Sequence, residues 1–158
     1  DAAKMLNGKY HDVRFVLAGE GSLRADLEKK CRDLNIYDKV EFLGFQKDII
    51  SIFNGLDLLV LPSLYEGLPL VVLEAGAMGK PVVVTNVDGS SEAVINNETG
   101  YVVAPKDSLA LKNAMERLLD NRHMAVEFGI NGRKNVEEHF DIYKQVMQTE
   151  RVYKGILV

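Results

Sequence analysis

The sequence predicts an α/β fold in which a parallel sheet is covered by helices. Short apolar runs alternate along the chain with longer amphipathic stretches. Several of these runs are apolar at nearly every position, which is typical of strands buried on both faces. The order is a repeated strand–helix unit, and such a repeat favours parallel strands joined by helical crossovers, in the manner of a Rossmann-like domain.

Five apolar runs are the expected strands, and the helices are expected between them. The strands start at Val13, Lys39, Asp57, Pro81 and Tyr101. The helices are predicted over Ser22–Leu34, Asp48–Phe53, Leu68–Met78 and Ser91–Ile95, the last with Asp88 or Ser90 as its cap.

Both ends of the chain are expected to be helical. Asp1–Asp12 has a helical composition, and Gly8 closes it. Helices are also predicted over Asp107–Leu119, His123–His139 and Ile142–Leu157, packed on the sheet or crossing to another domain. Because α/β folds usually begin on a strand, we expect that a first strand is missing before Asp1.

Composition limits the class of protein. The 158 residues carry a net charge of -4 and are 47% hydrophobic, which suits one globular domain over residues 1–158 and disfavours a nucleic-acid partner held by a broad basic surface. There is no apolar run of 18 residues and no signal peptide, so the sequence alone predicts no membrane span in this chain. A single cysteine, Cys31, fits a reducing compartment, and we expect a cytoplasmic protein.

A glycine pair follows the first expected strand. Gly19 and Gly21 lie between that strand and the next helix, where a backbone can approach a phosphate or a sugar. The pair is not a dinucleotide fingerprint, because Arg24 stands where its third glycine would be. A plain tight turn is the alternative explanation.

The stretch Pro62–Val84 is the most informative one. It is almost wholly apolar but carries Glu66 and Glu74, which are separated by seven residues. Ligands of open α/β sheets bind beyond the carboxyl ends of strands, where Glu66 and Gly67 are expected. Pro69 suits the first helical turn, and the free N–H groups of Leu70 and Val71 then favour an anion. Glu74 lies roughly 6–8 Å along the helix axis.

Two carboxylates therefore flank a helix start that is suited to an anion. A ribose offers a pair of hydroxyl groups to Glu74, and a phosphate over the helix start would complete a nucleotide. The alternative is structural: Glu66 caps the helix, and Glu74 pairs with Lys80 or a neighbour. The three histidines, His11, His123 and His139, have no metal-ligand spacing.

Within this stretch the segment "EGLPLVVLE", from Glu66 to Glu74, resembles the E-x7-E motif of glycosyltransferase family 4, which comprises retaining transferases of GT-B architecture. The resemblance extends from Val13 to about Leu119. It covers "FVLAGEGSLRADLEKKCRDLNIYDKVEFLGFQKDIISIFNGLDLLVLPS" before the motif and "EAGAMGKPVVVTNVDGSSEAVINNETGYVVAPKD" after it.

The resemblance implies a role for each matched residue. The chain would be the C-terminal, donor-binding half of an enzyme that moves a sugar from a nucleotide diphosphate sugar to a glycan or lipid acceptor. Glu66 would be the catalytic residue beside the donor sugar, and Glu74 would hold the ribose. The remaining residues expected around the donor are Gly19, Gly21, Phe45, Ser63, Gly67, Leu68, Leu70 and Val71. No metal and no cofactor would be needed.

This chain departs from the family pattern in three respects. The family places an Arg and a Lys on the first strand and the following loop, and both would precede Asp1, since Lys4 and Lys9 do not fill those positions. Pro69 removes one backbone donor, and Asp88–Gly89 replaces a glycine pair. Because the acceptor-binding domain is absent and the main cations for the diphosphate are missing, we expect the chain alone to bind nucleotide weakly and to transfer nothing.

Two other functions compete with transfer. One is a nucleotide-sugar epimerase of the same architecture, and the other is a nucleotide-sugar-binding module without catalysis. The expected partners are the donor and the N-terminal half of the same enzyme, through which it would reach the inner face of the membrane.

Overall fold

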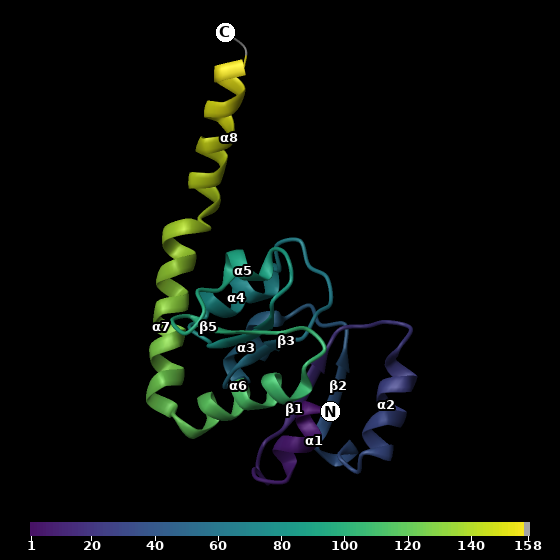
Figure 1. The fold of residues 1–158 in the computed structure, drawn as a ribbon. Coiled ribbons are helices and arrows are strands. Elements are labelled where there is room, and N and C mark those ends of the chain that lie inside the picture. Colours follow the sequence, from purple (N-terminus) through teal and green to yellow (C-terminus); the bar gives the residue numbers. More distant parts are fainter. Residues whose placement is uncertain (157–158) are drawn as a thin grey trace.

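The computed structural model describes residues 1–156 (Figure 1). The elements follow in the order α1 (Ala2–Asn7), β1 (Phe15–Ala18), α2 (Arg24–Asp33), a 3-10 turn η1 (Tyr37–Lys39), β2 (Val40–Gly44), α3 (Ile49–Gly55), β3 (Leu59–Leu61), α4 (Leu70–Ala77), β4 (Val82–Thr85), α5 (Ser90–Ala93), β5 (Gly100–Val103), α6 (Ser108–Asp120), α7 (Arg122–His139) and α8 (Ile142–Ile156). The predicted alternation of strands and helices is confirmed.

All strand pairs are parallel, as the sequence predicts. Within residues 1–156 they form two hydrogen-bonded groups, β1–β2 and β3–β4–β5. In the second group Val60 lies opposite Val83, which in turn lies opposite Tyr101. The carboxyl ends of β3, β4 and β5 therefore lie at one edge, as parallel pairing requires.

The core has two halves, one on each face of the β3–β4–β5 sheet. Val82, Val83 and Val84 are all buried, and successive side chains of a strand point to opposite faces. Val83 packs with Leu6 of α1, with Tyr101, and with residues of α6 and α7. The other half joins Val82 and Val84 to Phe53, Val72, Ala75, Ala93 and Val94. Burial on both faces explains why this strand is continuously apolar.

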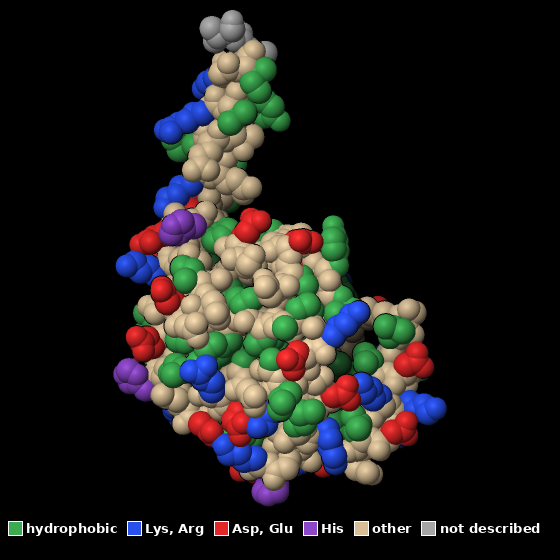
Figure 2. Space-filling view, in the orientation of Figure 1, with side chains coloured by type: hydrophobic (Ala, Val, Ile, Leu, Met, Phe, Trp, Pro, Cys, Tyr) green, Lys and Arg blue, Asp and Glu red, His purple; other side chains and the backbone are tan. Residues whose placement is uncertain are grey.

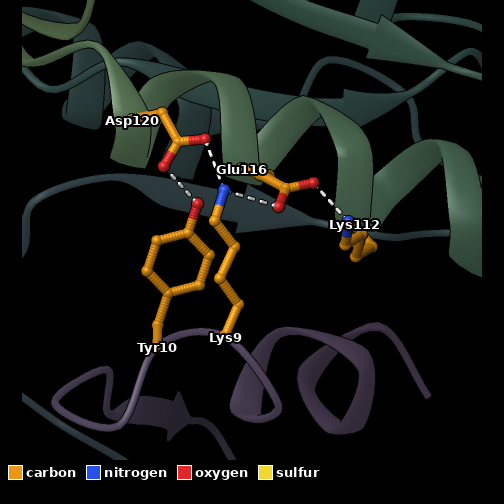
Figure 3. Close-up of polar contacts among 5 residues, drawn as sticks. All are labelled: Lys9, Tyr10, Lys112, Glu116 and Asp120. Atoms are coloured by element: carbon orange, nitrogen blue, oxygen red, sulfur yellow. Dashed lines mark hydrogen bonds and ion pairs between the residues drawn. The ribbon is translucent and has the colours of Figure 1, made fainter.

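A cluster of charged residues fastens the N-terminal segment to α6 (Figure 3). Lys9 Nζ lies 2.9 Å from Glu116 Oε1 and 2.7 Å from Asp120 Oδ2, and the Tyr10 hydroxyl donates to Asp120 Oδ1 at 2.5 Å. Lys112 also pairs with Glu116, one helical turn away. Leu6 of the same segment is wholly buried and packs against residues of α6, so apolar packing and ion pairs both hold this segment.

The cluster shifts the pKa of its carboxyl groups. Hydrogen bonds from Lys112 and then Lys9 hold the pKa of Glu116 below its ordinary value of 4.5. Hydrogen bonds from Lys9 and then Tyr10 do the same for Asp120. The pKa of Lys9 is raised, first by its bond to Asp120. Each ion pair therefore favours the charged forms at neutral pH.

Helix α7 approaches α4 and the turn after it closely enough to exclude a side chain. A Cβ atom added to Gly129 would lie 2.0 Å from the carbonyl oxygen of Gly79. A Cβ added to Gly76 of α4 would lie 3.0 Å from Val136 Cγ2. Glycine at these positions allows backbone to approach backbone, so α7 supports the helix that carries Glu74.

Helix α8 projects away from the rest of the chain and has no buried residue (Figures 1 and 2). Figure 2 shows its hydrophobic side chains gathered along one side. Ile142, Val146, Tyr153 and Ile156 are 57–74% exposed. With Thr149 they follow alternating spacings of four and three residues, which is the pattern of a helix that packs against another element.

Some boundaries differ from the sequence predictions. The N-cap of α5 is Gly89, because the helix begins at Ser90; Asp88 therefore lies one residue too early to cap it, and Ser90 is already inside it. The helix predicted over Ile142–Leu157 is present as far as Ile156, and Leu157 lies outside the described residues.

Candidate functional site

The site is built on the segment that joins β3 to α4. β3 ends at Leu61, and Pro62 follows it, which has no N–H to extend the strand pairing. The loop that follows carries Ser63 and Glu66 and ends at Pro69, the N-cap of α4. Figure 1 shows this loop beside α4 and α5.

Glu66 is half-buried and bonded within its own loop. The Ser63 hydroxyl donates a hydrogen bond of 2.6 Å to Glu66 Oε1. No side chain caps α4, so Glu66 does not serve as the helix cap that the structural alternative requires. Its second carboxylate oxygen makes no hydrogen bond within residues 1–156. Ser63 and Glu66, both predicted from the sequence, are therefore in direct contact.

Glu74 lies on α4, and its side chain is exposed. Lys80, the pairing partner in the structural alternative, donates instead to the carbonyl oxygens of Leu56 at 2.7 Å and Asn54 at 3.4 Å. Among residues 1–156 no ion pair or side-chain hydrogen bond involves Glu74. The ion pair between Glu74 and Lys80 that the structural alternative predicts is therefore not formed, and that alternative is wrong for Lys80.

The first turn of α4 presents backbone donors. Within residues 1–156 the N–H groups of Leu70 and Val71 donate no hydrogen bond, since the first bond of this turn runs from Val72 to Pro69. Leu68 and Leu70 are 42% and 66% exposed. The free N–H groups and the positive end of the helix dipole together favour an anion at this position.

The remaining predicted residues lie at the carboxyl ends of β1 and β2. The Gly19 N–H donates to the Gly44 carbonyl at 2.8 Å, and the Phe45 N–H reaches Glu20 Oε1 at 3.5 Å. The structure thus brings the glycine loop and Phe45 together. Phe45 is 66% exposed, and an atom added at Gly21 would meet nothing within 4 Å. The glycine loop and Phe45 follow the β1–β2 pair, whereas the Glu66 loop follows the β3–β4–β5 sheet.

A depression of about 150 Å³ lies at the carboxyl ends of β3, β4 and β5. Its lining residues are Pro62, Leu64, Thr85, Ala104, Lys106, Asp107, Ser108 and Leu111. A larger cavity of about 370 Å³ lies beside α6 and α7, and none of the predicted site residues lines either cavity. The loop that carries Glu66 borders the smaller depression through Pro62 and Leu64, so we place the candidate site beside it, at that loop and the start of α4.

Thr85 and Lys106 are two lining residues that sequence reasoning did not single out. Thr85 ends the strand Val82–Thr85, and its hydroxyl group at the end of an otherwise apolar buried run was the signal available in the sequence. Lys106 has no such signal, since it lies in a loop among other polar residues.

Neither a metal site nor a membrane span is found in the part of the chain that the structure describes. Residues 1–156 contain no group of three or more His, Cys, Asp or Glu side chains arranged to hold an ion. None of their helices combines the length and the apolar character that crossing a bilayer requires.

Comparison with known proteins identifies relatives along nearly all of the chain. The family described as "Glycosyl transferases group 1" matches residues 1–135. The chain is 33% identical over 161 residues to the UDP-Gal:alpha-D-GlcNAc-diphosphoundecaprenol alpha-1,3-galactosyltransferase of Escherichia coli, covering 100% of this chain and 41% of that protein. This chain thus spans about two fifths of that relative's length.

Solved structures show the same fold. The C-terminal domain of a glycosyl transferase group 1 family protein (LpcC) from Francisella tularensis superimposes with a TM-score of 0.82 at 29% identity, covering 89% of this chain and 76% of that one. TarM of Staphylococcus aureus, in a complex that includes UDP, gives a TM-score of 0.91 at 25% identity, covering 96% and 31%. The architecture is that of the C-terminal half of a GT-B glycosyltransferase, and the chain belongs to the glycosyl transferases group 1 family.

Proposed function

We propose that this chain is the donor-binding half of a retaining glycosyltransferase of family 4 and that its donor is a nucleotide diphosphate sugar. The observation that carries the proposal is Glu74, an exposed carboxylate on α4 with no protein partner among residues 1–156. Glu74 follows the first turn of α4, where the N–H groups of Leu70 and Val71 are also free within residues 1–156. A ligand with both hydroxyl groups and phosphates would satisfy all of these groups at once.

In this proposal each group acts on one part of the donor. Glu74 accepts hydrogen bonds from the ribose hydroxyl groups, and the N–H groups of Leu70 and Val71 hold the diphosphate. Glu66 orients the donor sugar, with its carboxylate fixed by Ser63. During transfer the bond between the sugar C1 and the diphosphate oxygen breaks, and its electron pair stays on the diphosphate. The acceptor hydroxyl oxygen bonds to C1 and gives its proton to the departing diphosphate oxygen.

The start of α4 would accelerate this step electrostatically. Negative charge grows on the diphosphate as the bond breaks, and backbone donors already aimed at that position stabilise it without reorganisation. No metal and no cofactor enter this scheme.

The names of two relatives support uracil as the base of the donor nucleotide. The Escherichia coli relative is named for UDP-Gal, and the TarM complex includes UDP. The first name also includes a diphosphoundecaprenol acceptor, which supports a glycan or lipid as the acceptor class.

The other half of the same enzyme is the proposed partner. The chain covers only 41% of its Escherichia coli relative, and α8 presents an exposed apolar stripe. We assign that stripe to the contact between the halves. The acceptor and the attachment to the inner face of the membrane would belong to the other half, in the cytoplasm.

The test is a titration of the purified chain with UDP, followed by NMR so that weak binding is measurable. Glu74→Gln keeps the shape of the side chain but removes the charge that strengthens its hydrogen bonds. We expect binding to weaken by about 10–100-fold, since hydrogen bonds to a charged group contribute about 1.5–3 kcal/mol.

The matched control is Glu41→Gln on β2. Glu41 is also exposed, and its loss changes the net charge equally, so UDP affinity should stay within about twofold of the unaltered chain. Equal affinity of the Glu74→Gln chain and the unaltered chain for UDP would contradict the ribose assignment.

A further inference from the structure

The loop that carries Glu66 is held from outside by the segment after β4. Within the loop, Glu66 depends on Ser63, whose hydroxyl donates to its carboxylate at 2.6 Å. That bond orients Glu66 only if Ser63 is itself fixed. The backbone on either side of Glu66 is fixed by two contacts that come from the adjacent strand and the segment that follows it.

The first contact is a hydrogen bond from Thr85, the last residue of β4. Its side chain is almost completely enclosed, with the residue 3% exposed. Its Oγ1 donates to the Ser63 carbonyl at 2.5 Å and lies 3.4 Å from the Leu61 carbonyl. The β3–β4 pairing ends with Leu61 opposite Val84, so the hydroxyl continues the attachment beyond the last paired residues.

The second contact is the close approach of Gly89 to the other end of the loop. A Cβ atom added to Gly89 would lie 1.3 Å from the Gly67 carbonyl oxygen and 2.4 Å from its carbonyl carbon. The backbone of Gly89 has φ of -61°, which any residue adopts. Glycine is therefore required here for space alone, and Gly67 rests directly on it.

We propose that Thr85 and Gly89 are positioning residues for Glu66. One fixes Ser63 and the other fixes Gly67, so the segment from β4 to α5 sets the place of the carboxylate between them. This inference rests on the proposed function, in which Glu66 meets the sugar and Glu74 meets the ribose. It follows that Thr85 controls binding of the sugar part of the donor and leaves the nucleotide part unaffected.

The test compares two substitutions at Thr85 and two ligands, UDP and UDP-galactose. Thr85→Val removes the hydroxyl group at nearly constant shape, and Thr85→Ser retains it. We expect Thr85→Val to lower the ratio of UDP-galactose affinity to UDP affinity by about 3–10-fold, which is the range of one hydrogen bond, with UDP affinity unchanged. Thr85→Ser should restore the ratio.

Thr99→Val is the matched control for loss of a buried threonine hydroxyl. Thr99 is 4% exposed, and its Oγ1 accepts a hydrogen bond from the Ile95 N–H at 2.9 Å, away from the Glu66 loop. This variant should lose stability but keep the affinity ratio. A ratio lowered equally by Thr99→Val and Thr85→Val would overturn the inference.

A double-mutant cycle with Glu66→Gln separates positioning from general damage. If Thr85 acts through Glu66, Thr85→Val should change the ratio no further in the Glu66→Gln chain. Independent, additive effects of the two substitutions on the affinity ratio would refute this mechanism. A Thr85→Val chain with unchanged affinity for both ligands would refute it too, as would one whose affinities for both ligands fall by the same factor.

Amide hydrogen exchange at Ser63–Gly67 tests, without a ligand, whether Thr85 fixes the loop that carries Glu66. Thr85→Val should accelerate exchange in this loop, and Thr85→Ser should not. If the unaltered chain binds neither UDP nor UDP-galactose, the proposed uridine donor fails. In that case, faster loop exchange in the Thr85→Val chain would still support the positioning inference, and unchanged exchange would refute it.

Discussion

Gly129 on α7 offers a sharp test of how the helix carrying Glu74 is supported. Its substitution by alanine would place a Cβ atom 2.0 Å from the Gly79 carbonyl oxygen. Real Cβ contacts essentially never fall below 3.0 Å, so the helix and the turn after α4 must separate by about 1 Å, the difference of the two distances. Neither contacting atom belongs to a flexible side chain, so backbone must move.

The magnitude follows from this geometry. Forcing extra atoms into a packed interior costs about 1–3 kcal/mol. Alanine also favours a helix over glycine by about 1 kcal/mol, which offsets part of the loss. We expect Gly129→Ala to lower the free energy of unfolding by up to about 2 kcal/mol and the melting temperature by up to about 8 °C for a chain of this size.

Gly132→Ala on the same helix is the control. A Cβ there would lie 3.6 Å from Gly76 Cα and 3.9 Å from Thr99, which are ordinary contact distances. This variant should therefore be stabilised, by about 0.4–1 kcal/mol. Urea unfolding of the two variants and the unaltered chain measures both effects. If Gly129→Ala proved as stable as Gly132→Ala, the proposed close backbone contact would be refuted.

Three further predictions concern other parts of the chain. The carboxyl groups of Glu116 and Asp120 have lowered pKa values, so their contribution to stability is present above their ordinary pKa values near 4 and is lost as the pH falls through the lower folded values. Lys9→Met should reduce this acid dependence in unfolding measured from pH 6 to pH 2, and an unchanged pH profile would contradict the role of the cluster. Ser90→Ala should raise the free energy of unfolding by about 1 kcal/mol, because Ser90 Oγ is buried without a partner in residues 1–156, and a loss of stability would indicate a missed partner. Val146→Lys should change the stability of this chain by less than about 0.5 kcal/mol, since Val146 is 57% exposed, but should destabilise the two-domain enzyme to which we propose the chain belongs, and equal effects in the two proteins would argue against the proposed contact of α8.

The sequence predicted the fold because burial leaves a pattern in the chain. Val82, Val83 and Val84 are apolar in succession because the strand has helices on both faces, and an uninterrupted apolar run of this length is readable in the sequence. Boundaries were less predictable. The cap of α5 is Gly89, although Asp88 and Ser90 have the side chains that usually cap helices.

The sequence by itself determined that Glu66 and Glu74 flank one helix start, since a short spacing along a loop and a helix fixes their separation. Only the tertiary structure decided their neighbours. It turned Lys80 toward the Leu56 carbonyl and left Glu74 without a protein partner in residues 1–156. It also set Thr85 and Gly89 against the ends of the Glu66 loop. Contacts of this kind depend on which strands lie side by side and how closely helices pack, and no local pattern of residues encodes either.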